Sequence, residues 1–149
     1  MDFKTFHPVH AYHPPASMLP PGFRFPKAYL DYVNQKVVPI LDPWWFMCHT
    51  KGTRYYNNWV SILKRQFPDR HLVPFAKWEL DDDVACFELS NDPDLPTIHY
   101  IHSFTDPGYE ERGCCATFEE RLEVALEEAR KYQVDHPVED DFDEWYQEY

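Results

Sequence analysis

The spacing of hydrophobic residues along the chain predicts three helices. One begins at Pro26, because proline suits the first helical turn, and the pattern ends at Pro39. A second helix covers residues 55–68, and a third begins at Thr117, which forms a capping box with Glu120. The apolar stripes of the three helices are Tyr29, Leu30, Val33 and Val37; Trp59, Ile62, Leu63 and Phe67; and Phe118, Leu122, Ala125, Leu126, Ala129 and Tyr132.

Between the second and third helices the pattern changes to the alternation typical of strands. Residues 71–80, 84–89 and 97–104 are expected to form strands, as is the short aromatic stretch 41–48, and residues 105–113 are expected to be a loop. Neighbouring strands joined by short loops favour antiparallel pairing. We therefore expect a single α+β domain in which a mostly antiparallel sheet is packed against N-terminal helices and a C-terminal helix. In the last strand one face should carry Ile98, Tyr100, His102 and Phe104.

Composition divides the chain into three parts. Residues 1–22 are rich in proline and should form an extended arm, residues 23–132 hold the predicted domain, and residues 133–149 form an acidic, aromatic tail that is either disordered or docked. Three evenly spaced histidines lie in the arm. That spacing would gather metal ligands only on a helix, which the prolines disfavour, so no metal site is expected there. The three are His7, His10 and His13.

The charge is unevenly distributed. Residues 1–78 carry 10 Lys+Arg against 4 Asp+Glu, whereas residues 79–149 carry 4 against 22. Such an acidic chain is a poor nucleic-acid binder, because phosphate contacts need clustered cations. It suits a basic protein partner, although acidity also simply favours solubility. With no membrane-spanning apolar run and no secretory signal at the N-terminus, the expected location is cytoplasmic, without membrane contact.

The residues offer little evidence for catalysis. The four cysteines have neither disulfide-framework nor zinc spacing, so we expect buried or half-buried free thiols. Nucleophile, phosphate-loop and dinucleotide motifs are missing, and His99 and His102 should point to opposite faces of their strand. We therefore predict that the chain is not an enzyme and needs no cofactor. The cysteines are Cys48, Cys86, Cys114 and Cys115.

Three consecutive aspartates in WELDDDVACFEL raise the question of a metal, a turn or a partner surface. A calcium loop needs alternating acidic residues and a glycine, which are missing here. A three-residue turn between Leu80 and Val84 explains the aspartates better, since Asp tolerates turn geometry. We predict a hairpin turn without a metal ion, whose acidity remains to be explained.

Four segments, taken in order, resemble the SUKH superfamily. FPKAYLDYVN resembles its opening helix, LVPFAKWELDDDVACFEL its central hairpin, PTIHYIHSF the next strand and ATFEERLEVALEE the closing helix. The resemblance covers roughly residues 23–132. It implies an α+β domain without catalysis. Bacterial members are mostly immunity proteins that neutralise a cognate toxin, and fungal relatives regulate cell-wall synthesis through protein contacts.

The function expected from this resemblance is that of an immunity protein binding a toxin, such as a basic nuclease or deaminase domain, through an acidic surface. The alternative is an intracellular scaffold or regulator on the same fold. Residues 79–94 hold seven carboxylates and no basic residue, which favours this region as the surface. A merely solvated hairpin tip remains the ordinary alternative for each residue. The predicted contacts are Trp78, Glu79, Asp81, Asp82, Asp83, Asp92 and Asp94.

Overall fold

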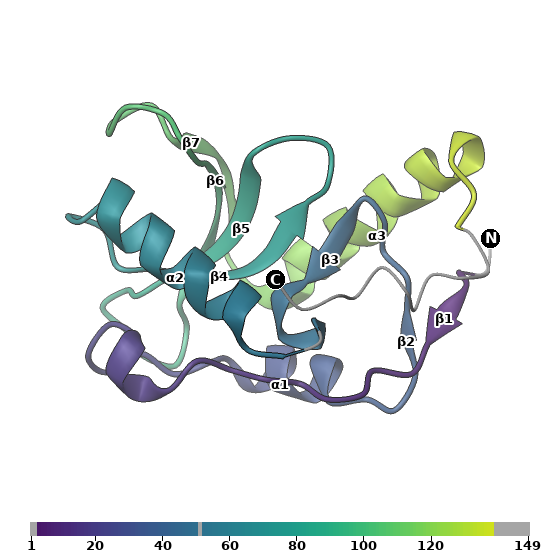
Figure 1. The fold of residues 1–149 in the computed structure, drawn as a ribbon, viewed down its shortest axis with the longest axis horizontal. Coiled ribbons are helices and arrows are strands. Elements are labelled where there is room, and N and C mark those ends of the chain that lie inside the picture. The colour runs from purple at the N-terminus through teal and green to yellow at the C-terminus, as the bar shows by residue number, and fades with distance from the viewer. Residues whose placement is uncertain (1–2, 51, 139–149) are drawn as a thin grey trace.

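An antiparallel sheet of five strands lies at the centre of the protein (Figure 1). The computed structural model describes residues 3–50 and 52–138. The strands pair in chain order, and a second, two-stranded sheet joins β1 (Thr5–Phe6) to β2 (Val38–Pro39). This confirms the predicted single α+β domain. The central strands are β3 (Trp44–Phe46), β4 (Leu72–Trp78), β5 (Asp83–Glu88), β6 (Thr97–His102) and β7 (Glu111–Cys115).

Three α-helices pack on the sheet at the positions that the sequence predicts. Their apolar stripes are buried or half-buried against the sheet, apart from the end of the first. No helix among the described residues is long and apolar enough to cross a lipid bilayer. The helices are α1 (Lys27–Val33), α2 (Arg54–Gln66) and α3 (Phe118–Asp135), with the short 3₁₀ helices η1 (Ala16–Met18) and η2 (Met47–His49).

The sheet is covered on both faces. Tyr100 is in register with Ala76 through β5, so the two share a face, and the Arg121 guanidinium of α3 lies 4.8 Å from the Tyr100 ring. Lys77, the next residue of β4, points to the other face, where its Nζ lies 5.8 Å from the Trp59 ring of α2. Because both faces are covered, the four central residues of β5 are buried.

Aromatic rings join α1 to the sheet and to α3. Phe75 of β4 and Phe87 of β5 stack with their centroids 4.3 Å apart. Tyr29 of α1 packs edge-on against Phe87 at 5.3 Å and against Phe118 of α3 at 5.5 Å. Large rings in such contacts bury extensive apolar area, which helps a domain of this size to form one core.

The first helix is shorter than predicted. α1 ends at Val33, with Asn34 as its C-cap, rather than near Pro39. The backbone then extends to form β2, whose register with β1 buries Val38. Val37, predicted on the apolar stripe, is consequently 43% exposed.

The region after β6 also differs from the prediction. Residues 111–113, expected to be loop, belong to β7, and a register shift between Tyr100 and Ile101 in the β6–β7 pairing accompanies burial of both Ile98 and Ile101. β6 ends at His102. Phe104 is therefore outside the strand, and the predicted four-residue face is wrong at that position.

The predicted arm and the described first residues of the predicted tail contact the domain. Residues 3–22 contain β1, η1 and a turn at residues 21–22, and α3 continues to Asp135. Val138 is buried in a small cluster, whereas residues 139–149 lie outside the described part of the chain. The arm's side chains that pack on the main core include Phe3, Ala11, Tyr12, Met18 and Leu19.

Candidate partner-binding surface

The β4–β5 connection is a tightly held turn. We call residues 79–83 the acidic turn. Lys77 Nζ donates to the carbonyl oxygen of Trp78 at 2.6 Å and to that of Asp81, and Asp81 Oδ1 accepts the Asp83 N–H at 2.8 Å. The last contact is the side-chain-to-backbone bond for which aspartate is favoured in turns. The predicted hairpin is confirmed, but its connection covers residues 79–82 instead of the predicted three residues between Leu80 and Val84, because Asp83, which we include in the acidic turn, is already the first residue of β5.

Asp83 is engaged within the sheet. It is half-buried and in register with His102 of β6, whose Nδ1 lies 2.8 Å from Asp83 Oδ1. Arg112 Nε of β7 lies 4.0 Å from the same oxygen. This carboxylate is thus paired before any partner arrives, which makes it a weaker contact candidate than its neighbours.

The Asp82 carboxylate is the most available of the three aspartates. Its side chain is exposed and forms no hydrogen bond or ion pair with another residue of the described chain. Its backbone is fixed, because the Asp82 carbonyl oxygen accepts bonds from Ser103 N at 3.0 Å and Ser103 Oγ at 2.7 Å. The turn thus presents this charge on an ordered backbone.

Trp78 does not project as an anchor. Its ring is half-buried and lies 4.9 Å from the ring of Trp44, edge to face. Glu79 is exposed, and its N–H donates to the Pro43 carbonyl at 2.8 Å. Burial raises the pKa of the nearby Asp42 to about 6, and the charge of Glu79 acts in the same direction.

Asp92 and Asp94 lie at the other end of the sheet. They belong to the β5–β6 connection, whereas the acidic turn precedes β5, and six strand residues span about 20 Å. Asp92 Oδ1 accepts the Asp94 N–H at 3.0 Å, and Asp94 pairs with Arg24 at 2.6 Å in an exposed ion pair. The predicted contacts therefore form two separate groups rather than one surface.

The acidic turn has side chains of the types that bind metal cations, but the positive charges of Lys77 and Arg112 disfavour a cation there. Ligand atoms of Asp81, Asp83 and His102 lie within 4.8 Å of one another, the one such group found in residues 3–50 and 52–138. Lys77 and Arg112 already offset these carboxylates. Burial lowers the pKa of Lys77, and the charges of the three aspartates act against that shift. The arrangement is that of an ion-paired turn.

The arm's histidines have separate partners. His10 Nε2 lies 2.8 Å from the Thr50 carbonyl oxygen, and His13 Nε2 lies 3.2 Å from the Tyr29 hydroxyl. His7 is exposed. The rings of His10 and His13 thus meet different parts of the core, and His7 lies at the surface.

A charged cluster around Arg70 was not predicted. The Arg70 guanidinium donates to Glu88 at 2.8 and 2.9 Å, to Glu110 at 2.8 Å and to Glu111 at 3.0 Å. Hydrogen bonding from Arg70 lowers the pKa of Glu88. The four residues come from three separate places in the chain, so sequence spacing carried no signal for this cluster, which ties β5 to β7.

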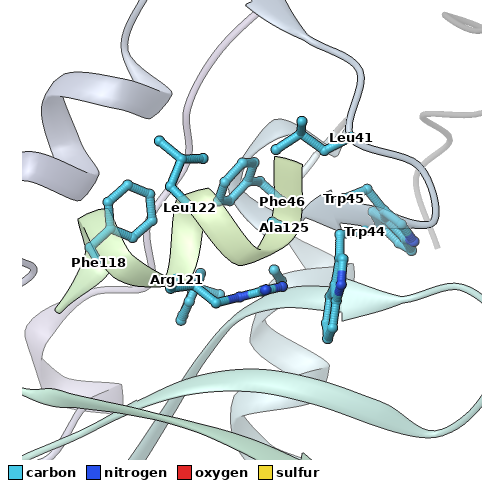
Figure 2. A pocket seen from close by; sticks show the side chains of 10 residues that line it. Leu41, Trp44, Trp45, Phe46, Phe118, Arg121, Leu122 and Ala125 are labelled. Atoms are coloured by element: carbon cyan, nitrogen blue, oxygen red, sulfur yellow. The ribbon is translucent and has the colours of Figure 1, made fainter. Parts of the chain in front are cut away.

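Arg121 is a second unexpected charge, buried beneath α3 (Figure 2). Its guanidinium points toward Trp44, 4.1 Å from the ring, and donates to the Tyr100 hydroxyl at 3.1 Å. The adjoining cavity measures ≈ 10 Å³ and has room for about one water molecule. This space is too small for a substrate, and the guanidinium packs against the rings of Trp44 and Tyr100 and lies 3.6 Å from Glu128.

Protein-family models, curated proteins and solved structures were searched, and none matched. The SUKH resemblance therefore rests on the four sequence segments.

Proposed function

We propose that the chain is a non-catalytic immunity protein that binds and neutralises a toxin domain through the acidic turn. The observation that carries this proposal is that the acidic turn, which bears four carboxylates, has a fixed backbone. Lys77 and Ser103 donate hydrogen bonds to the backbone carbonyl oxygens of Asp81 and Asp82. Charge held in place before binding speeds encounter with a basic partner and loses little entropy on docking. The SUKH resemblance supports the immunity role specifically.

The state of the buried thiols supports a non-catalytic role. Burial raises the pKa of Cys48 to about 12, and burial also raises that of Cys86. Both thiols are protonated at neutral pH, whereas the thiolate is the nucleophile in cysteine catalysis. Cys48 and Cys86 therefore act as core residues.

The first test is affinity purification of the tagged protein from its native cells, followed by mass spectrometry. We expect a near-stoichiometric partner with a secretion region and a basic C-terminal domain, and co-expression should restore the growth of cells that make this domain. Recovery of cell-wall or signalling proteins instead would favour the regulator alternative. No specific partner, under conditions in which a toxin is made, would contradict the proposal.

A charge-reversal pair then tests the surface against that partner. The Glu79→Lys/Asp82→Lys variant should slow association and weaken its salt dependence, because exposed charge mainly sets the on-rate. The Asp69→Lys/Glu123→Lys variant makes the same net charge change at exposed positions elsewhere. Equal association rates for the two variants would mean that the acidic turn is not the interface.

A further inference from the structure

Phe104 is displayed in an unusual way just beyond β6. Its side chain is 63% exposed, and its backbone has a φ of 60°, in the left-handed region that bulky residues rarely adopt. The Phe104 N–H donates to Gln66 Oε1 at 2.8 Å, which helps to hold this conformation. The structure thus keeps an exposed aromatic ring on a strained backbone, and strained backbone conformations cluster at functional sites.

Two independent contacts place Phe104 beside the acidic turn. Its neighbour Ser103 donates twice to the Asp82 carbonyl. On the side covered by α2, the Phe104 ring lies 6.1 Å from the Trp59 ring, and Lys77 Nζ, which donates to the turn, lies 5.8 Å from the same ring. The ring and the turn therefore belong to one continuous end of the sheet.

This end combines exposed apolar side chains with a negative charge. Leu80, within the acidic turn, is 55% exposed. The four carboxylates of the acidic turn are offset by Lys77 and by Arg112, which lies 4.0 Å from Asp83, so the turn itself keeps a negative balance. Aromatic anchors carry much of the energy of protein interfaces, and charge at the rim selects and steers the partner.

We propose that Phe104 and the acidic turn form one docking surface for a protein segment in which lysine or arginine flanks an aliphatic or aromatic side chain. The proposal rests on the proposed function, since it names the contacts of the same surface. It replaces Trp78 by Phe104 as the anchor: the Trp78 ring is packed against Trp44, whereas the Phe104 ring is open to a partner.

The test selects short random peptides from a display library, with the full chain as bait. Enriched peptides should combine Lys or Arg with a large apolar residue. Their affinity should fall at least about tenfold for Phe104→Asn and for Asp82→Lys, in line with the loss of a central contact. Asparagine tolerates a positive φ, so Phe104→Asn should retain or raise the unfolding temperature. Leu95→Asn, at a residue 62% exposed in the connection at the other end of β5, should bind as the parent does.

The outcomes separate this surface from the immunity role. Peptides that bind Phe104→Asn as tightly as the parent chain, or a library that yields no enriched sequence, would overturn the docking surface. A lowered unfolding temperature with unchanged affinity would do the same, because it would assign the ring to packing against Trp59. If peptides bind and lose affinity in the Phe104→Asn and Asp82→Lys variants, the docking surface is supported even where no toxin is recovered from cells. If a toxin is recovered and binds the Phe104→Asn variant as tightly as the parent, the docking surface is wrong but the immunity role still stands.

Discussion

The carbonyl oxygen of Asp82 accepts two hydrogen bonds from Ser103, one from the backbone N–H at 3.0 Å and one from the hydroxyl at 2.7 Å. Ser103 is fully buried just after β6, whereas Asp82 lies exposed in the turn before β5. The two bonds join the residue that follows β6 to the connection between β4 and β5. They therefore hold in place both the acidic turn and the start of the segment that contains Phe104.

Replacing Ser103 by alanine should loosen this connection. The hydroxyl bond is lost while the backbone bond remains, so the free energy of unfolding should fall by about 1 kcal/mol, the usual net value of one hydrogen bond. Affinity for peptides selected on the parent should fall as well, because the turn is no longer held as firmly. Urea denaturation and peptide titration measure the two effects.

Ser90→Ala is the matched control. The Ser90 hydroxyl bridges the carbonyl oxygens of Asp92 and Leu95, both at 3.0 Å, in the connection at the other end of β5. Its loss should leave peptide affinity unchanged. If Ser90→Ala weakens binding as much as Ser103→Ala does, the effect is global and the docking surface is misplaced.

Replacing Arg70 by methionine should be costly. Methionine keeps the aliphatic stem but leaves the buried Glu110 without its guanidinium partner, which should cost about 3 kcal/mol. Glu111→Gln, at an exposed member of the cluster, should cost less than about 1 kcal/mol. Similar losses in the two variants, measured by urea denaturation at neutral pH, would contradict this difference between buried and exposed members.

The cost of Arg70→Met should shrink in acid. Hydrogen bonding from Arg70 lowers the pKa of Glu88 from its usual 4.5. A lowered carboxyl pKa stabilises the folded chain above pH 4.5, and this stabilisation is lost as the pH falls through the folded pKa. The variant lacks this contribution, so its stability should approach that of the parent below pH 4.5.

Local patterns predicted most of the helices and strands. The capping box works as expected, with Glu120 N donating to Thr117 Oγ1 at 3.2 Å, and α2 falls within two residues of its predicted ends. β7 was missed because its sequence, ERGCC, lacks alternation. That strand forms by pairing with β6, and the local spacing of hydrophobic residues does not reveal this contact.

The candidate site was less accessible to sequence reasoning. The carboxylates of residues 79–94 are close in sequence but are divided in space by strand β5, which separates the acidic turn from Asp92 and Asp94. The hydrogen bonds from Ser103 to Asp82 join residues that are 21 positions apart in the sequence. The left-handed φ of Phe104 could not be predicted either, because this position is not a glycine or an asparagine. Pairings of this kind depend on the assembled sheet.

Arg121 provides a test of buried charge used in packing. Burial lowers the pKa of its guanidinium, which lies between the rings of Trp44 and Tyr100. Arg121→Met keeps most of the volume without the buried charge and should change stability by less than about 1.5 kcal/mol. Arg121→Ala should cost about 2–4 kcal/mol, because it enlarges the adjoining cavity. A methionine variant as unstable as the alanine variant, in thermal unfolding, would show that the charge itself is required.

Asp42 should make the protein less stable as the pH rises through the weakly acidic range. Burial raises its pKa from the usual 3.8 to about 6, and Glu79 adds to the shift. Between these values the unfolded chain has released the proton that the folded chain still holds, so stability falls with rising pH. A shift of two pKa units corresponds to about 2.7 kcal/mol, and partial exposure reduces this contribution to about 1–2 kcal/mol.

Asp42→Asn isolates this contribution from that of the other carboxylates. The variant should match the parent near pH 4 and exceed its stability by about 1–2 kcal/mol at pH 7, in urea denaturation at both values. Glu79→Gln should produce a smaller gain, because it removes only the lesser cause of the shift. An advantage of Asp42→Asn that is equal at both pH values would mean that Asp42 ionises normally in the folded chain. Since Glu79 belongs to the acidic turn, a basic partner that pairs with it should also lower the pKa of Asp42, which links binding to pH at this edge of the sheet.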